Sequence, residues 1–238
     1  MAGGLGTRMN SELPKVLHKI DGVPMLVKVI KEALTVNPLK IFIVVGTYKD
    51  IISQTLERYD VLENIEFIIQ SPALGTGHTI MCARDKLKNY KNHNLVVLSG
   101  DVPCFTGDYM VQLGKCNGVS IITRSTEDNN GYGRVIFNDN KFEKIVEEKD
   151  ATDKEKLVEL VNCGVYAFSI NGLLKNLDKL SNKNAQSEYY ITDLVKILND
   201  DGYDVTSIEM EKHEEYKVMG VNNPHQLKML EILMLNDN

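Results

Sequence analysis

Helical and strand periodicities of apolar residues alternate along the chain from residue 24 onward, and this alternation restricts the possible folds more than any other feature. Apolar residues in 24–36 recur every three to four positions, which is typical of an amphipathic helix. Asn37-Pro38 ends that pattern. Residues 41–45 then form a continuous apolar run that is too short for a buried helix and indicates a strand covered on both faces. Strands and helices in this order predict a mostly parallel sheet with crossover helices.

The same rhythm continues to about residue 98 and then changes. The patterns predict helices at 47–58 and 76–88 and strands at 65–69 and 95–98. From about residue 118, strands predicted at 119–123, 134–137 and 142–146 follow one another closely, separated by turn residues at 130–131 and 138–140, which indicates a meander or hairpin. Beyond them the patterns predict a short helix at 152–160, a strand at 162–169, and amphipathic helices at 190–200 and 225–235.

Together these elements predict an α/β fold: a doubly wound, mostly parallel mixed sheet with a small β-rich subregion. No repeat, low-complexity tract or linker divides the sequence. We therefore expect one domain over residues 1–238, in which 1–117 form a nucleotide-binding half and 118–238 form a second half.

Composition excludes several classes of function. The net charge of −6 gives no general attraction to nucleic acid or to an anionic membrane surface. No apolar run approaches the roughly 20 residues that a membrane-spanning helix needs. The four cysteines form no CxxC pair and the five histidines form no ligand cluster. We expect a cytoplasmic protein with free thiols, bound neither to nucleic acid nor to a membrane.

The opening segment carries glycines and two cations that suit a polyphosphate. Glycine lets backbone N–H groups of Ala2, Gly3 and Gly4 approach a phosphate, and Arg8 and Lys15 can neutralise its oxygens. The segment is neither a Rossmann fingerprint nor a P-loop, because Met9 stands at the third glycine position and no GKS or GKT follows. The structural alternative is a flexible N-terminal tail.

Asp101 directly follows the strand predicted at 95–98, after Ser99 and Gly100. Ligands of open α/β sheets bind at the carboxyl ends of strands. A carboxylate there suits Mg²⁺, which takes one or two protein carboxylates and keeps waters and phosphates as its other ligands. The alternative is that Asp101 only caps a turn before Pro103.

A second polar segment follows the strand at 65–69. The amide of Gln70 can read a pyrimidine edge because it both donates and accepts hydrogen bonds, and Gly75 and Thr76 open the next helix. His78 lies in the first turn of that helix, where we expect a structural rather than a catalytic histidine.

The second half of the sequence contains polar groups that suit a hydroxyl-rich ligand such as a sugar, so we expect 118–238 to be a sugar-binding half. They are Gly133, Glu147, Asn162, Tyr190 and Thr192. The alternative for Glu147 and for Asp150 is a solvated face, and for Glu148 we expect that face.

In their order and spacing these segments resemble the sugar-1-phosphate nucleotidylyltransferases, and most closely the N-acetylglucosamine-1-phosphate uridylyltransferases. The similarity covers almost the whole chain. It is carried by seven segments: 3–9, 13–18, 74–78, 100–103, 131–134, 184–190 and 220–223. The resemblance implies the Rossmann-like fold of the nucleotide-diphospho-sugar transferases.

The resemblance also implies roles for the residues named above. On the nucleotide side, the backbone of Ala2, Gly3 and Gly4 lies against the nucleotide, and Arg8 and Lys15 hold phosphates as the catalytic cations. Uracil is contacted by Gln70, Gly75 and Thr76. Part of the pocket wall is formed by Ser99 and Gly100. Asp101 and Asn222 are the implied Mg²⁺ ligands. On the sugar side, Gly133, Glu147 and Asn162 contact the amino sugar and its ribose neighbourhood, and Tyr190 and Thr192 line the sugar pocket.

The implied reaction is transfer of UMP from UTP to N-acetylglucosamine 1-phosphate, with release of pyrophosphate. A transferase for another sugar 1-phosphate, such as glucose 1-phosphate with UTP or dTTP, is the nearest alternative. A catalytically silent nucleotide-sugar-binding subunit is the alternative from another class. No hexapeptide repeat follows residue 235, so we expect no acetyltransferase domain and no trimer built by one, and a monomer is compatible with the sequence.

One departure concerns the strand that precedes the glycine loop in such enzymes, because the sequence begins at Met1 and contains almost none of it. We expect the functional protein to start upstream, and a loop without that strand to be poorly anchored.

Overall fold

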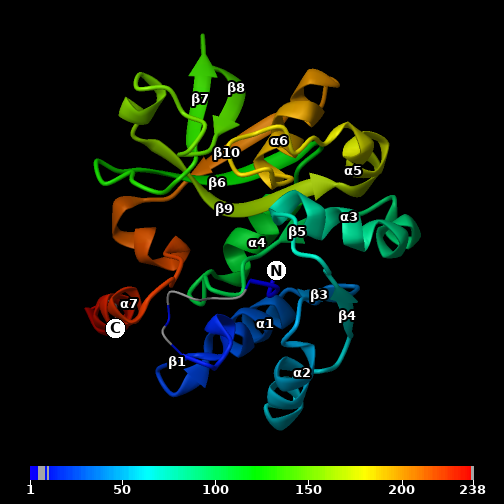
Figure 1. Cartoon of the computed structure of the whole chain (residues 1–238), viewed down its shortest axis with the longest axis vertical. Helices are drawn as coiled ribbons and strands as arrows, with labels where there is room; N and C mark the ends of the chain where they lie inside the picture. The colour runs from blue at the N-terminus through cyan, green and yellow to red at the C-terminus, as the bar shows by residue number, and fades with distance from the viewer. Residues whose placement is uncertain (5–8, 10, 237–238) are drawn as a thin grey trace. The chain divides into compact units, whose positions relative to one another are not determined.

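A computed structural model of the chain describes residues 1–4, 9 and 11–236. The chain forms two compact units (Figure 1). Unit 1 consists of Met1–Ala73, Leu98–Val111 and His213–Asn238, and unit 2 consists of Leu74–Val97 and Gln112–Lys212. Each unit is therefore assembled from segments far apart in the sequence, a division that differs from the sequence halves 1–117 and 118–238.

Most of the helices and strands that periodicity predicts are present close to their predicted positions. The helices are α1 (Met25–Thr35), α2 (Lys49–Arg58), α3 (Thr76–Leu87), α4 (Gly107–Gly114), α5 (Ile170–Asn176), α6 (Ile191–Asp200) and α7 (Pro224–Asn236). The strands are β1 (Lys19–Ile20), β2 (Val23–Pro24), β3 (Ile41–Val45), β4 (Ile65–Ile69), β5 (Asn94–Val97), β6 (Val119–Ser125), β7 (Arg134–Asn138), β8 (Lys141–Val146), β9 (Leu160–Ser169) and β10 (Val205–Glu209). Short 3₁₀ helices are η2 (Lys15–Leu17), η3 (Lys88–Tyr90), η4 (Glu155–Leu157), η5 (Leu177–Lys179) and η6 (Lys212–Val218).

In unit 1, β3 and β4 pair in parallel, from Ile41 opposite Ile65 to Val45 opposite Ile69. The chain between them forms α2, which is the predicted crossover. Both α1 and α2 lie beside this strand pair (Figure 1), and their apolar faces pack on β3 in one buried cluster. The segments that directly follow these strands carry polar residues of the candidate site, such as Gln70 after β4.

The first two residues extend the strand pairing of unit 1. The Ala2 nitrogen donates to the Val44 oxygen at 2.8 Å, and Ala2 forms a parallel bridge with Val45. The Met1 nitrogen donates to the Leu98 oxygen at 2.7 Å, and the Met1 oxygen accepts from the Gly100 nitrogen at 2.9 Å. These bonds anchor the start of the glycine-rich segment beside β3.

Unit 2 contains a six-stranded mixed sheet in the order β10-β6-β9-β7-β8, with β5 also paired to β9. Only β10 and β6 pair in parallel within this sheet, and β9 is antiparallel to β5, β6 and β7. A two-residue turn with positive φ at both Asp139 (48°) and Asn140 (61°) joins β7 to β8, as a tight hairpin requires. The predicted α/β fold class with a mixed sheet is confirmed.

Two local predictions in unit 2 are wrong. The strand at 119–123 does not continue the hairpin, because β6 pairs with β9 and β10; its residues are buried along most of its length, as befits an interior strand. The helix at 152–160 is a single 3₁₀ turn, η4. Thr152 and Glu155 form a reciprocal capping box at its start, but Val158 is already extended and leads into β9.

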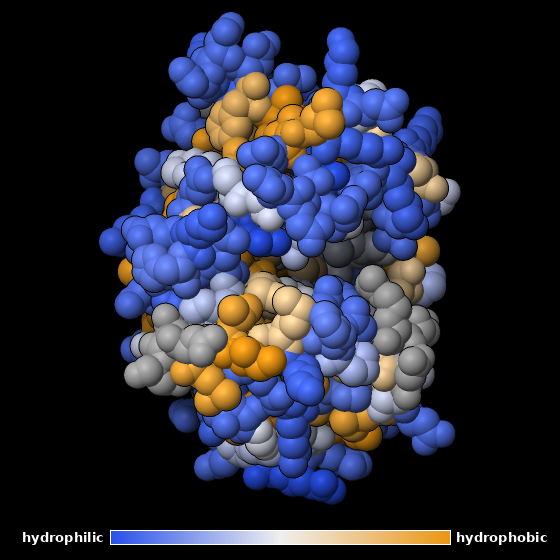
Figure 2. Space-filling view, turned by 90° about the vertical axis from the view of Figure 1, so that its left-hand side faces the viewer, coloured by the Kyte–Doolittle hydropathy of each residue, from blue (hydrophilic) through white to orange (hydrophobic). Residues whose placement is uncertain are grey.

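The last helix, α7, is less amphipathic than its sequence pattern indicates. Leu230 is fully buried, whereas Leu235 is 76% exposed, and three further apolar side chains are also exposed: Met229, Ile232 and Leu233. Hydrophobic surface is visible on the side of the molecule where α7 lies (Figure 2). Among the helices of the described residues, none is long and apolar enough to cross a membrane.

Candidate functional site

Lys15, Asp101 and Asn222 converge in unit 1 although they come from three distant segments. The Lys15 ammonium donates to Asp101 Oδ2, and at 3.0 Å to Asn222 Oδ1. The other carboxylate oxygen, Asp101 Oδ1, accepts from the Ser99 hydroxyl at 2.6 Å. The side chains of Lys15 and Asp101 are each only 15% exposed, so their charges interact in a partly desolvated setting.

Local packing explains why these three residues meet. Lys15 begins η2, whose Val16 and Leu17 are buried in the core of unit 1. A side chain at Gly100 would meet the Met1 oxygen and a Val16 methyl group, each at 3.1 Å, so glycine allows the chain to pass closely just before Asp101. Val221 N donates to Asp101 O at 2.9 Å and thereby brings Asn222 alongside.

The donor set at this point suits a small divalent cation. A carboxylate oxygen and an amide oxygen both face the Lys15 ammonium, which marks the position where positive charge is stabilised. Mg²⁺ binds oxygen ligands and typically takes few from the protein. Within the described part of the chain, no cluster of three or more His, Cys, Asp or Glu side chains could hold a metal ion. Asp101 and Asn222 are the candidate ligands in unit 1 because their side-chain oxygens meet at the Lys15 ammonium.

The glycine-rich segment and Gln70 also lie together in unit 1. Gln70 N donates to Val45 O at 2.8 Å, and a Cβ at Gly3 would lie 3.0 Å from Gln70 Oε1. A Cβ at Gly46 would lie 3.1 Å from the Gly3 oxygen. Ala2 is buried, and the space around Gly4 is open. Gly46, which directly follows the apolar run 41–45, had not been predicted as a site residue.

Arg8, the other predicted phosphate-binding cation, lies outside the described residues. Its role stays a prediction from the sequence.

In unit 2, the loop at the start of α3 is hydrogen-bonded to the segment that precedes α6. Tyr189 N donates to Leu74 O at 2.8 Å, and the Thr76 hydroxyl accepts from Ile191 N at 3.0 Å. Gly75 has φ +104°, and a Cβ there would lie 2.5 Å from the Tyr189 oxygen. Only glycine fits this conformation and this contact without displacement.

Glu147, Thr192 and Gly133 are brought together in unit 2. The Thr192 hydroxyl donates to Glu147 Oε1 at 2.7 Å, and a Cβ at Gly133 would lie 3.6 Å from Glu147 Oε2. Burial raises the pKa of Glu147; the Thr192 hydrogen bond lowers it, and the nearby Asp193 and Asp150 raise it further. A carboxylate with this raised pKa is a strong hydrogen-bond acceptor in a poorly solvated place.

Asn162 belongs to the same group. Its backbone nitrogen donates to Gly133 O at 2.8 Å, and its side-chain amide donates to the Tyr166 hydroxyl at 2.7 Å. Burial raises the pKa of Tyr166, and the charge of Glu147 adds to that shift, so this hydroxyl stays neutral. Tyr166 was not predicted as a site residue. Its position in an apolar strand pattern gave no signal for it.

Tyr190 is buried and bound on two sides. Its hydroxyl donates to Asp150 Oδ2 at 3.1 Å and accepts from Gln186 Nε2 at 3.0 Å. Burial raises the pKa of Tyr190 to about 12. Asp150 also accepts from Ala185 N at 2.9 Å, so its carboxylate is engaged by the 185–190 segment rather than only by solvent.

The predicted site residues therefore form two groups. Unit 1 contains Ala2, Gly3, Gly4, Lys15, Gln70, Ser99, Gly100, Asp101 and Asn222; unit 2 contains Gly75, Thr76, Gly133, Glu147, Asn162, Tyr190 and Thr192. His78, expected to be structural, stacks on the Tyr189 ring at 6.2 Å and lies 3.7 Å from Cys82 Sγ.

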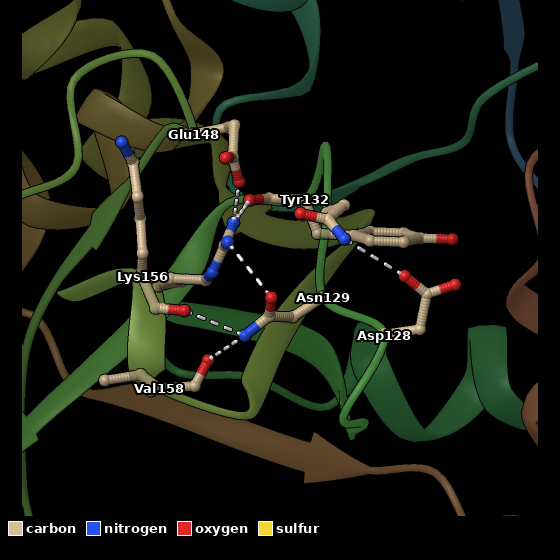
Figure 3. A network of polar contacts seen from close by, with 8 residues as sticks. Asp128, Asn129, Tyr132, Glu148, Lys156 and Val158 are labelled. Carbon is tan, nitrogen blue, oxygen red and sulfur yellow. Dashed lines mark hydrogen bonds and ion pairs between the residues drawn. The ribbon is translucent and has the colours of Figure 1, made fainter. Parts of the chain in front are cut away.

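A charged network in unit 2 includes Tyr132 and Glu148, the sequence neighbours of Gly133 and Glu147 (Figure 3). Arg134 is 1% exposed and forms a 2.5 Å ion pair with Glu148. Its guanidinium also donates to Tyr132 O and, at 3.2 Å, to Asn129 Oδ1. Asn129 in turn donates to Lys156 O and Val158 O (Figure 3). The expectation that Glu148 is merely part of a solvated face is wrong.

Comparison with known proteins identifies the family of this chain. The family model described as nucleotidyl transferase matches residues 1–214. The chain belongs to the nucleotidyl transferase family. Most of the described site residues lie within the matched segment; Asn222 lies just beyond it.

Among curated relatives, a probable UDP-N-acetylglucosamine pyrophosphorylase of Acanthamoeba polyphaga mimivirus is 36% identical over 238 residues, covering 97% of this chain and 93% of that protein. The bifunctional protein GlmU of Fervidobacterium nodosum is 42% identical over 238 residues, and that of Streptococcus agalactiae is 37% identical over 240. The alignments cover 98% of this chain but 49% and 50% of those two proteins. The chain thus spans about half the length of these two bacterial relatives.

Among solved structures, the crystal structure of a putative glucose-1-phosphate thymidylyltransferase from Bacillus anthracis superposes with a TM-score of 0.75. The match covers 100% of this chain and 94% of that one at 19% identity. This likeness supports the nucleotidyltransferase fold.

Proposed function

We propose that this nucleotidyltransferase transfers UMP from UTP to N-acetylglucosamine 1-phosphate and releases pyrophosphate. The observation that carries the proposal is the convergence of Lys15, Asp101 and Asn222 on one point of unit 1. A cation, a carboxylate and an amide oxygen at one point suit a phosphate–metal site. The name of the mimiviral relative, a probable UDP-N-acetylglucosamine pyrophosphorylase, supports UDP-N-acetylglucosamine as the product.

Asp101 and Asn222 would hold Mg²⁺ in this proposal. When bound, Mg²⁺ would neutralise phosphate charge and so reduce the repulsion between the two anionic substrates. Ser99 serves the same site by fixing Asp101 Oδ1, which leaves Oδ2 directed toward the cation position.

Lys15 and Arg8 act on the leaving group. Transfer of a nucleotidyl group concentrates negative charge on the departing pyrophosphate, and cations placed there in advance stabilise that charge. No residue has to serve as general base, since the phosphate oxygen of the sugar substrate is ionised near pH 7. The residues of the chain position the two substrates and neutralise phosphate charge; they do not have to move a proton.

Unit 2 would bind the sugar. Glu147 offers an acceptor whose second oxygen is not used by Thr192, and Asn162 and Gly133 lie beside it. Acceptors and donors fixed in this way can orient sugar hydroxyls. The Gln70 amide in unit 1 is the group proposed to read the uracil edge.

The test is a coupled assay of pyrophosphate release with purified chain, Mg²⁺, UTP and N-acetylglucosamine 1-phosphate. Glucose 1-phosphate and dTTP are run as competing substrates, because pocket contacts of this kind discriminate by about 10- to 200-fold. We expect the highest kcat/KM for UTP with N-acetylglucosamine 1-phosphate. Faster turnover of another pair would reassign the substrate, and UDP-sugar binding without pyrophosphate exchange would indicate a silent binding protein.

A further inference from the structure

Lys15 binds the same two oxygen atoms that are proposed to hold the metal ion. Its ammonium donates to Asp101 Oδ2, and at 3.0 Å to Asn222 Oδ1. The second oxygen of the carboxylate is already bound to Ser99, 2.6 Å away. In this arrangement the side chain of Lys15 is itself the cation that neutralises Asp101.

A divalent ion and the ammonium cannot share this position. Mg²⁺ lies about 2.0–2.1 Å from its oxygen ligands, so an ion bound to both oxygens would occupy the space next to Lys15 Nζ. Two cations at such a distance repel each other, and solvent screens that repulsion poorly because Lys15 and Asp101 are mostly buried. Binding of the metal therefore requires Lys15 to leave both oxygens.

We propose that Lys15 is a displaceable internal counter-ion of the metal site. Without metal, its ammonium holds Asp101 and Asn222 together; with metal, the released ammonium becomes available to an anionic phosphate group. This inference rests on the proposed metal role of Asp101 and Asn222. It links metal binding to phosphate binding, because a metal ion that binds the oxygens of Asp101 and Asn222 releases the Lys15 ammonium for a phosphate group.

The chemistry of lysine fits this role better than that of arginine. Lysine is a compact point charge on a flexible four-carbon stem, whereas arginine forms a planar fork that holds a carboxylate through two bonds. Lysine can therefore change partners within the reach of its side chain. An arginine at position 15 would compete with the metal more strongly.

The test measures Mn²⁺ binding to the full chain without nucleotide, from the electron paramagnetic resonance signal of free Mn²⁺. We expect Lys15→Met to lower the Kd for Mn²⁺ by about tenfold, since the competing charge is gone. Lys31→Met is the matched control: it removes the same charge from an exposed position of α1 in the same unit. We expect it to change the Kd by less than twofold, and Lys15→Arg to raise the Kd.

The inference is overturned if Lys15→Met binds Mn²⁺ no more tightly than the wild type does while Lys31→Met keeps the wild-type Kd. A second measurement uses the wild-type chain, in case Lys15→Met does not fold. Lysines are ¹³C-dimethylated, the Lys15 signal is assigned by its loss in Lys15→Arg, and Mg²⁺ is added. The Lys15 signal should shift along the metal-binding curve, and a signal that stays fixed while metal binds also overturns the inference.

The inference and the proposed function can fail separately. If the wild type releases pyrophosphate from UTP and N-acetylglucosamine 1-phosphate but Lys15→Met gains no metal affinity, only the inference is wrong. If no sugar phosphate is turned over but Lys15→Met does bind Mn²⁺ more tightly, the counter-ion role stands and the proposed reaction is wrong. If Asp101→Ala binds Mn²⁺ as tightly as the wild type, the metal site is elsewhere and the inference fails with it.

Discussion

The main-chain nitrogen of Val221 donates a 2.9 Å hydrogen bond to the main-chain oxygen of Asp101. This bond connects the segment before α7 to the segment after Leu98, and it places Asn222 where Lys15 can reach both residues. Backbone bonds therefore fix the spacing between the two proposed metal ligands. Changes to the side chain of Asp101 should then alter the chemistry of the site more than its shape.

We expect Asp101→Ala to lower kcat by about 10²-fold or more, because it removes a charge that positions the transition state. The measurement is pyrophosphate release at saturating Mg²⁺ and UTP, with the thermal unfolding midpoint recorded in parallel. Asp108→Ala serves as the control, since Asp108 is an exposed acid at the start of α4. Full turnover by Asp101→Ala would refute the assignment of this residue.

Gly75→Ala should destabilise the protein because two penalties combine. Gly75 has φ +104°, and a methyl group there would lie 2.5 Å from the Tyr189 oxygen. Gly131→Ala separates the two effects, since Gly131 has φ +79° with open space around it. We expect Gly131→Ala to cost about 1–2 kcal/mol and Gly75→Ala to cost more, in urea unfolding. Equal losses would show that the contact with Tyr189 is unimportant.

Much of the fold could be predicted because apolar periodicity is a local property. The strand expected at 41–45 is β3, and the helix expected at 24–36 is α1. Pairing partners were less predictable, because they depend on segments distant in sequence. The central strand of unit 2, β9, pairs with β5, β6 and β7, and no periodicity reveals those neighbours.

The site shows the same division between local and distant information. Asp101 could be placed at a strand's end from its own neighbourhood, whereas its bond to Lys15, a residue 86 positions away, emerges only in three dimensions. Asp150 was ambiguous because nothing near it in sequence indicates that Tyr190 donates to it. Sequence motifs locate the functional segments, and tertiary hydrogen bonds decide which side chains in them are engaged.

Thr192→Val should raise the pKa of Glu147. Burial already raises that pKa, and the hydrogen bond from the Thr192 hydroxyl counteracts part of the shift. Removing the hydroxyl leaves the buried carboxylate with one donor fewer. The measurement is ¹³C NMR titration of labelled glutamate, with Thr206→Val on β10 as a control at an exposed position. An unchanged or lower Glu147 pKa would contradict the expected effect.

The raised pKa of Glu147 also fixes the sign of its effect on stability. The folded-state pKa lies above the unfolded value, so the folded state holds the proton more tightly. The contribution of Glu147 to stability is therefore fully present below the unfolded pKa and is lost as the pH rises through the folded pKa. In Glu147→Gln this particular dependence should disappear, which urea unfolding between acid and neutral pH measures. A persisting dependence would mean that another group titrates.

Glu148→Ala should destabilise the fold by about 2–3 kcal/mol, because it leaves the buried guanidinium of Arg134 without its counter-charge. The value is below that of a fully buried pair, since the Glu148 side chain is 32% exposed and water can replace part of the interaction. Glu143→Ala, which removes an exposed acid from β8, is the control in urea unfolding at pH 7.

The hydrogen bond from Arg134 holds the pKa of Glu148 below its usual range. The stability that Glu148 contributes is thus present above the unfolded glutamate pKa and is lost as the pH falls through the lower folded pKa. The difference in unfolding free energy between the wild type and Glu148→Ala should therefore shrink on acidification below about pH 4.5. A difference that stays constant into that range would show that packing of the side chain, and not its charge, stabilises the network around Arg134.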